Sequence, residues 1–250
     1  MCCFTSEVNE VSDTSIFARV DDLGFQYLVY QMKVDTPEDV AMVLPVPVRP
    51  ALGAGGLEFV DFAGYPDFFE DMNLAFPPPA SYGLSYVSAA PVPSPTLKVH
   101  KVGNFIASFV PSLADFDRLD ERLRLPAGTW EKVPMYQQSG FGFAVFKLRK
   151  GRTKVHPMAL RFQTSNRMKL FFPTVHIHDG EIHEYEQFDH SLYCQGNYKE
   201  LADAWSESPS LANTTIDLKK SKDFIAGDAH LFRRKINGFK ANKDVILNLG

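Results

Sequence analysis

The sequence of residues 170–190 is LFFPTVHIHDGEIHEYEQFDH, and it holds four of the seven histidines in the chain. An Asp-Gly pair between alternating residues is the strongest short-range signal for a β-hairpin, because a two-residue type I′ turn needs positive φ at both central positions. The pattern therefore predicts that residues 174–178 pair antiparallel with residues 181–185. In that register, His176 lies opposite His183.

Successive side chains of a strand point to opposite faces, so this predicted hairpin has one apolar face and one histidine-rich face. The apolar face carries Val175, Ile177 and Ile182, and the other carries His176, His178 and His183. Directly opposed residues of two strands lie about 5 Å apart. Three imidazoles at such spacings can converge on one ion, whereas the apolar face is expected to be buried.

This arrangement predicts a transition-metal site with His176, His178 and His183 as ligands. Three nitrogen ligands and an open fourth position suit zinc and activate a bound water, and copper or iron come second because imidazole binds all three. Glu181 and His190 are candidates for a fourth ligand or a general base. Two alternatives remain: a metal-free acid–base site, or a wet strand face whose histidines are merely solvated or hydrogen-bonded.

A second candidate site lies at the start of the chain, where Cys2 and Cys3 follow Met1. If Met1 is removed, Cys2 carries a free α-amine beside its thiol. An N-terminal nucleophile uses its own amine as the base, and the same atoms chelate soft metals. The alternative is that both cysteines are small apolar residues that begin a strand.

Composition excludes several classes of protein. The chain has 250 residues, of which 45% are hydrophobic and 22% are charged, and this is typical of a globular protein. A net charge of −4 without a basic stripe argues against nucleic acid as a partner. No apolar run is long enough to cross a membrane, and the first residues do not resemble a signal peptide. With three cysteines, we expect a cytoplasmic protein.

The pattern of apolar residues predicts a β-rich α+β fold of antiparallel, sandwich-like sheets with two or three short helices. Residues 14–34 should form a hairpin. Residues 41–48 should form an edge strand or leave the sheet at Pro45 and Pro47, because neither proline can donate to a ladder. Helices are expected at residues 112–124 and 197–206.

Domain organisation is expected to follow the proline-rich segment at residues 74–96. We expect an N-terminal β unit at residues 1–73, a connecting loop or flap at residues 74–96, and a C-terminal β-rich unit at residues 97–250 that carries the histidine hairpin. One compact domain is the alternative. The strands on the two sides of the flap resemble each other, which suggests an internal duplication.

The N-terminal third, roughly residues 1–75, resembles a bacterial family catalogued only as a domain of unknown function. The resemblance rests on the cluster Cys2-Cys3-Phe4, a following hairpin, and the Val-Leu-Pro-Val-Pro element that ends at Pro47. Members of that family are mostly exported, whereas a signal peptide is not visible here. The resemblance implies a β-rich fold, and no activity attaches to the family.

Three hypotheses for function follow. The first is a metal-binding protein, either a metal-dependent hydrolase or an oxidoreductase, and the second is an N-terminal-cysteine hydrolase that uses Cys2. The third is a non-catalytic binding or scaffold module. The sequence does not identify a small-molecule or peptide ligand, a reaction or an oligomeric state.

Overall fold

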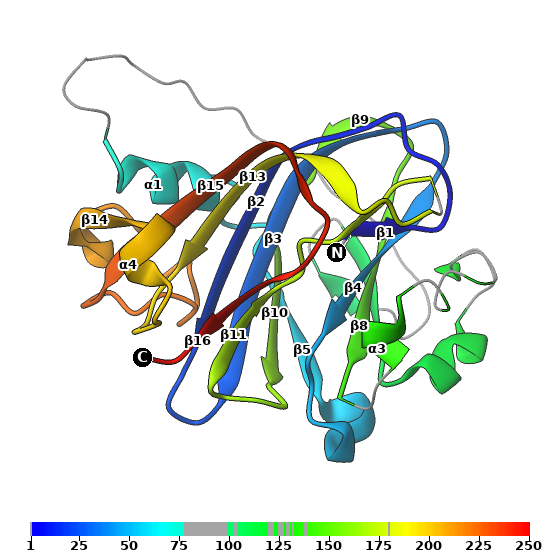
Figure 1. Ribbon diagram of the computed structural model, residues 1–250, viewed down its shortest axis with the longest axis horizontal. Helices are drawn as coiled ribbons and strands as arrows, with labels where there is room; N and C mark the ends of the chain where they lie inside the picture. Colours follow the sequence, from blue (N-terminus) through cyan, green and yellow to red (C-terminus); the bar gives the residue numbers. More distant parts are fainter. Residues whose placement is uncertain are drawn as a thin grey trace.

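A computed structural model describes residues 2–77, 100–102, 105–119, 123–124, 128, 131, 133–137, 140–179 and 181–250. The predicted flap lies outside the described residues beyond residue 77. Two large sheets dominate the described part of the chain, and Figure 1 shows the long strands β15, β13, β2 and β3 side by side.

The first sheet has six strands among the described residues, in the order β12-β1-β4-β8-β7-β6. Their bounds are β1 (Cys2–Phe4), β4 (Val40–Val46), β6 (His100–Val102), β7 (Phe105–Val110), β8 (Gly142–Leu148) and β12 (His176–Ile177). We call it the six-stranded sheet.

The second sheet has eight strands among the described residues, in the order β14-β15-β13-β2-β3-β10-β5, with β9 also paired to β3. Their bounds are β2 (Glu10–Val20), β3 (Phe25–Thr36), β5 (Leu57–Asp61), β9 (Gly151–Lys154), β10 (Met158–Gln163), β13 (Tyr185–Cys194), β14 (Ser206–Leu211) and β15 (His230–Ala241). We call it the eight-stranded sheet. A separate ladder joins β11 (Lys169–Phe172) to β16 (Val245–Asn248).

Helices are short throughout the described ranges. The α-helices are α1 (Phe68–Leu74), α3 (Pro134–Gln137) and α4 (Leu201–Ala204), and the 3-10 helices are η1 (Pro50–Gly55), η2 (Leu113–Arg118) and η4 (Ala212–Thr214). The predicted β-rich α+β fold with antiparallel sheets and short helices is confirmed, although β1 with β12 and β13 with β2 pair in parallel. None of the described helices has the length and apolarity needed to span a membrane.

The hairpin predicted at residues 14–34 is confirmed as β2 and β3, which pair antiparallel. Asp21 closes its turn, because its side chain accepts hydrogen bonds from the backbone N–H groups of Leu23 and Phe25 at 3.0 and 2.8 Å. Gly24 adopts a φ of 82°, which favours glycine. The turn therefore follows from local chemistry that the sequence displays.

Of the two alternatives predicted for residues 41–48, the edge strand is wrong, because β4 lies inside the six-stranded sheet between β1 and β8. The other is confirmed at Pro47, because β4 ends at Val46. Pro45 is tolerated there for a simple reason. On one side it pairs with Phe143 of β8, and on the other side the short β1 reaches only to Val43. Pro45 therefore lies beyond the last residue of β4 that pairs with β1, so its lack of an N–H group removes no hydrogen bond from that ladder.

Two helix predictions are also wrong in extent. In the described residues 112–119 the helix is confined to η2, and Leu119 already has an extended backbone with φ −76° and ψ 152°. The Ser112 hydroxyl donates to the Asp115 carboxylate at 2.8 Å, so it does not cap the backbone as the predicted capping box requires. Of residues 197–206, only Leu201–Ala204 are helical.

The main core fills the space between the two large sheets. Met42 and Phe146 of the six-stranded sheet pack in one cluster with Leu28 and Leu160 of the eight-stranded sheet. Because side chains alternate along a strand, Phe17 of β2 points to the outer face of the eight-stranded sheet. There it joins a second apolar cluster beneath α1. The Phe146 ring meets the Phe59 ring edge-on at 5.5 Å, and this contact joins the two sheets directly.

We expect Phe146→Ala to lower the free energy of unfolding by about 3–5 kcal/mol, because it opens a cavity between the sheets. The measurement is urea unfolding monitored by circular dichroism. Leu23→Ala is the matched control, because Leu23 is 76% exposed, and it should change stability by less than about 0.5 kcal/mol. Equal effects of the two substitutions would refute this assignment of the core.

Candidate histidine site

The predicted histidine hairpin is wrong in its pairing. β12 runs parallel to β1, so His176 lies opposite Cys2 and Ile177 lies opposite Cys3. The strand that follows, β13, begins only at Tyr185 and pairs with β15 and β2. His183 is therefore not opposite His176.

Side-chain partners explain why the hairpin does not form. The Asp179 carboxylate accepts hydrogen bonds from the Glu181 backbone N–H at 2.9 Å and from His183 Nε2 at 3.0 Å. The bond from Glu181 is that of an Asx turn. Gly180, the second residue of the predicted β-turn, lies outside the described residues. The preceding backbone is held elsewhere, because His176 N–H donates to Asn242 Oδ1 at 2.7 Å and Thr174 N–H donates to Asp244 Oδ1 at 2.9 Å.

The predicted burial of the apolar residues is confirmed for two of the three, although the predicted pairing is wrong. Val175 and Ile177 are buried in one cluster with the outer face of the six-stranded sheet, and Ile182 packs against that cluster while partly exposed. Alternation does not separate buried from exposed side chains in this segment, because Thr174 and His176 of the other face are also buried, with 1% and 4% exposure.

Three histidines gather at this end of the molecule: His176 on β12, His178 just after it and His190 on β13. His176 and His190 are 4% and 1% exposed, and their Nε2 atoms lie 3.1 Å apart. The ring of His178 lies 4.9 Å from that of His176. We call these three residues the histidine cluster.

Aromatic side chains enclose the histidine cluster. The Phe188 ring lies 4.5 Å from that of His176 and 5.1 Å from that of His190, and the Phe4 ring lies 5.7 Å from that of His178. Such apolar surroundings disfavour a charged imidazole. Burial lowers the pKa of His176 to about 2, that of His190 to about 3 and that of His178 to about 4. All three rings are neutral at physiological pH.

Three ring nitrogens of the histidine cluster have no hydrogen-bond partner in the described structure. His176 Nδ1, His178 Nε2 and His190 Nδ1 are buried and make no hydrogen bond within the described part of the chain. The Asp189 carboxylate lies 3.8 Å from His190 Nδ1, too far for a hydrogen bond. Each unsatisfied buried polar atom lowers the free energy of unfolding by about 1–3 kcal/mol, so the unpaired nitrogens of the cluster destabilise the fold.

The remaining predicted site residues lie in different places. His183 and Glu181 are exposed on the loop before β13, and His183 pairs with Asp179 outside the histidine cluster. The backbone of Cys2 lies beside His176, while its side chain is outside the described part of the structure. The structure therefore brings together His176, His178 and His190.

An open surface pocket of about 580 Å³ borders the cluster at His178. His178 contributes to its wall together with residues of the exposed loop and of β15: Asp179, His183, Glu184, Tyr185, Glu186 and Phe239. The rings of Tyr185 and Phe239 stack at 5.8 Å with an angle of 21° between them. A ligand would therefore reach the histidine cluster at His178.

Acid should destabilise the fold through the buried histidines. In the unfolded chain each binds a proton near its ordinary pKa of 6.5, whereas His176 and His190 stay neutral in the fold until about pH 2–3. Stability should therefore fall as pH decreases below about 6.5, by about 1.4 kcal/mol per pH unit for each of the two. Urea unfolding between about pH 7 and pH 4, with a chelator present, measures this slope.

Replacing one buried histidine should make this slope shallower. We expect His190→Phe to reduce it by about 1.4 kcal/mol per pH unit. His183→Ala serves as the control, because the exposed His183 has a raised pKa and is not a source of the loss. An unchanged slope in His190→Phe would contradict the burial of a neutral imidazole.

Comparisons with known proteins give distant structural similarities alone. No protein-family profile and no curated protein matches the sequence. Similar solved structures include baculovirus P35, with 15% identity, a TM-score of 0.48 and coverage of 96% of this chain and 97% of that one. P35 in its complex with caspase-8 has 12% identity, a TM-score of 0.44 and coverage of 95% and 96%. At TM-scores below 0.5, we assign neither a fold family nor a function from these similarities.

Proposed function

We propose that this protein binds a transition metal ion, zinc first and copper or iron second, through His176, His178 and His190. The observation that carries the proposal is the 3.1 Å separation of two buried Nε2 atoms. Zinc–nitrogen bonds of about 2.0–2.1 Å at tetrahedral angles place two ligand nitrogens about 3.3 Å apart. His176 and His190 therefore lie close to the spacing that one shared ion requires.

The protonation state of the cluster also supports the proposal. Metals bind the neutral imidazole, and an ion must otherwise displace a proton. Burial holds the pKa values of His176 and His190 near 2 and 3, so both rings are ready to bind at physiological pH. Without an ion, one Nε2–H can only donate to the other Nε2, and both Nδ1 atoms remain unsatisfied.

His178 is the proposed third ligand. Among the described side chains, no group of three or more His, Cys, Asp or Glu already stands in metal-ligand geometry. The His178 ring lies 4.9 Å from that of His176, and its buried Nε2 has no partner. We therefore propose that His178 rotates toward the ion when it binds. Cys2 is a candidate fourth ligand, because its backbone lies beside His176.

The chemistry of such a site depends on the fourth position. An open position on zinc would activate water for hydrolysis, whereas copper or iron would support oxidation and reduction. The surface pocket beside His178 gives a substrate a route to that position. A filled position would instead make a structural site in a binding or scaffold module.

A second candidate function uses the same location. The backbone register that places Cys2 beside His176 also favours a cysteine nucleophile with a neighbouring imidazole as its base. The buried thiol of Cys194 supports our proposal of a reducing, cytoplasmic compartment, where thiols persist.

Purified protein should bind one zinc or cobalt ion per chain, as measured by elemental analysis and by calorimetric titration of the chelated, metal-free protein. We expect His190→Ala to weaken binding at least about 100-fold, because even residues behind the ligands contribute 10–100-fold. His183→Ala is the matched control and should bind as the unmodified protein does. The absence of binding, or an equal loss in His183→Ala, would refute the proposed ligand set.

The role of Cys2 can be tested separately by its effect on the cobalt spectrum. If Cys2 is a ligand, cobalt-loaded protein should show thiolate-to-cobalt charge transfer, and Cys2→Ala should abolish that band while the histidine-dependent bands remain. If Cys2 is instead an N-terminal nucleophile, intact mass must show that Met1 has been removed. Retention of Met1 would exclude the nucleophile and leave the metal proposal unaffected.

A further inference from the structure

The outer face of the eight-stranded sheet changes from apolar to polar along its strands. Tyr193, Phe17 and Val29 form one registered row across β13, β2 and β3, and this row packs beneath α1. Two residues further along each strand, and hence on the same face, the corresponding row is Ser191, Ser15 and Gln31. This second row is the floor of a cleft that we call the polar cleft.

The polar cleft has a volume of about 310 Å³, within the size range of small-molecule sites. Its walls come from α1, β9 and β15, which contribute Phe69, Glu70, Asn73, Lys154 and Lys235. His190 and Asp189 are neighbours on β13 and point to opposite faces, so the polar cleft and the histidine cluster lie on the two sides of one strand. The two sites are therefore separate.

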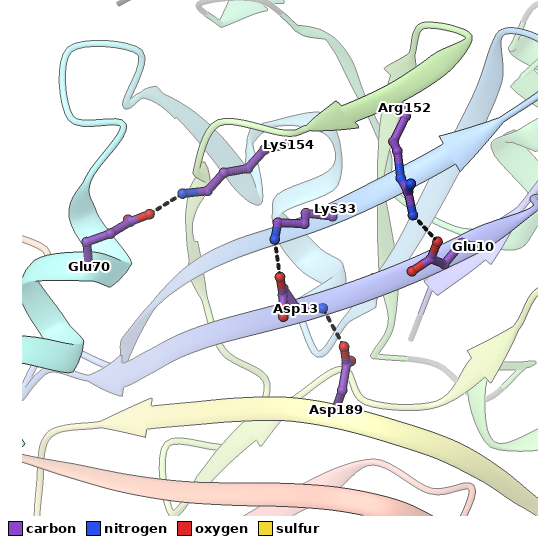
Figure 2. Close-up of polar contacts among 7 residues, drawn as sticks. All are labelled: Glu10, Asp13, Lys33, Glu70, Arg152, Lys154 and Asp189. Atoms are coloured by element: carbon purple, nitrogen blue, oxygen red, sulfur yellow. Dashed lines mark hydrogen bonds and ion pairs between the residues drawn. The ribbon is translucent and has the colours of Figure 1, made fainter. Parts of the chain in front are cut away.

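A β-bulge shapes one side of the polar cleft. The register of β2 against β3 shifts between Ser12 and Ser15, and Asp13 adopts a φ of 51°. The Asp13 backbone N–H donates to the Asp189 carboxylate, which holds the bulge against β13 (Figure 2). As a result, both Thr14 and Ser15 line the cleft.

Thr14 provides evidence that the cleft is built for a ligand. The residue is 1% exposed, lines the cleft, and its hydroxyl has no hydrogen-bond partner in the described structure. Buried hydroxyls are nearly always hydrogen-bonded, because an unpaired one loses the hydration it had in the unfolded chain. The hydroxyl is covered in this structure, so the Thr14 side chain would have to rotate toward the polar cleft for a ligand to supply the missing partner.

Among the lysines around the polar cleft, one forms no ion pair within the described structure. Lys33 pairs with Asp13 and Lys154 pairs with Glu70, as Figure 2 shows. Asp189 is engaged by the backbone of the bulge. Lys235 lines the cleft and has no ion-pair partner among the described residues. The groups that can bind a ligand are consequently the Lys235 ammonium and the hydroxyls of the floor, of which that of Ser191 also forms a hydrogen bond with Tyr193.

We propose that the polar cleft binds a small hydroxylated oxyanion, a molecule that carries a carboxylate or phosphate together with several hydroxyl groups. Lys235 binds the anionic group, aided by the remaining N–H groups of Lys33. Thr14, Ser15 and Ser191 bind the ligand hydroxyls, for which each can both donate and accept. Lys33 and Lys154 offset the charges of Asp13 and Glu70. Asp189 accepts a backbone N–H group, which leaves its charge in place, so the ammonium of Lys235 must outweigh its repulsion.

Calorimetric titration of the full chain tests this proposal, with inorganic phosphate, glucose 6-phosphate and gluconate as probes. The buffer contains a chelator and constant chloride, so that metal binding at the histidine cluster does not affect the result. We expect a hydroxylated probe to bind more tightly than inorganic phosphate, and comparison of the phosphate with the carboxylate identifies the preferred anion. If no probe binds, or if inorganic phosphate binds as tightly as the hydroxylated probes, the proposal is overturned.

The lysine variants test the anion contact. Lys235→Gln should weaken binding about 10- to 100-fold, as expected for loss of a charge-assisted hydrogen bond. Lys240→Gln is the control, because Lys240 lies on β15 away from the cleft, and it should bind as the unmodified protein does. Equal binding by Lys235→Gln and Lys240→Gln would show that the anion binds elsewhere.

Thr14→Val separates binding from folding. It removes the unpaired hydroxyl with little change in size, so the thermal midpoint should stay constant or rise while binding of the hydroxylated probe weakens at least several-fold. Ser191→Ala provides a second variant on the floor and should also weaken binding. Variants that keep both the thermal midpoint and the affinity of the unmodified protein would contradict the proposal.

Discussion

The contact between the imidazoles of His176 and His190 joins the two large sheets at one edge of the molecule. His176 belongs to β12 of the six-stranded sheet, and His190 belongs to β13 of the eight-stranded sheet. Their Nε2 atoms meet among aromatic rings, where a charged imidazole is strongly disfavoured. The geometry of this edge thus depends on both rings remaining neutral, whether they share a hydrogen bond or an ion.

Backbone anchoring positions that contact. The side chains of Asn242 and Asp244 bind the backbone N–H groups of residues 174–176, and the Asn242 amide also donates to the His176 and His183 carbonyls at 2.9 and 3.0 Å. These partners come from a segment almost seventy residues later in the sequence. They fix β12 beside β1, where Cys2 is opposite His176.

The sequence predicted the β-rich class and the hairpin of β2 and β3, because these depend on local alternation and turn chemistry, and it predicted the burial of the apolar Val175 and Ile177. It also identified His176, His178 and His190 among its candidates. It did not predict their arrangement, because the Asp179 side chain forms an Asx turn and Asn242 holds the preceding strand. Asp favours an Asx turn as well as a β-turn, so the local sequence does not decide between the two, and the Asn242 contact comes from 66 residues later in the sequence.

The polar cleft could not be predicted from the sequence, for a related reason. Ser15, Gln31 and Ser191 come from three strands, and only the parallel register of β13 with β2 aligns them. Each residue alone is an ordinary polar position of a strand. The bulge at Asp13 likewise depends on Asp189, more than one hundred residues away in the sequence. Sites assembled across a sheet become visible only when the register is known.

X-ray absorption spectroscopy of the zinc-loaded protein tests the central claim most directly, because it measures the atoms bound to the ion. The histidine cluster predicts a four-coordinate site with three nitrogen ligands at about 2.0–2.1 Å, and a sulfur at about 2.3 Å if Cys2 also binds. The imidazole signal should be lost from His190→Ala. A shell of six oxygens, as expected for an ion held by surface carboxylates and water, would contradict the proposed metal site.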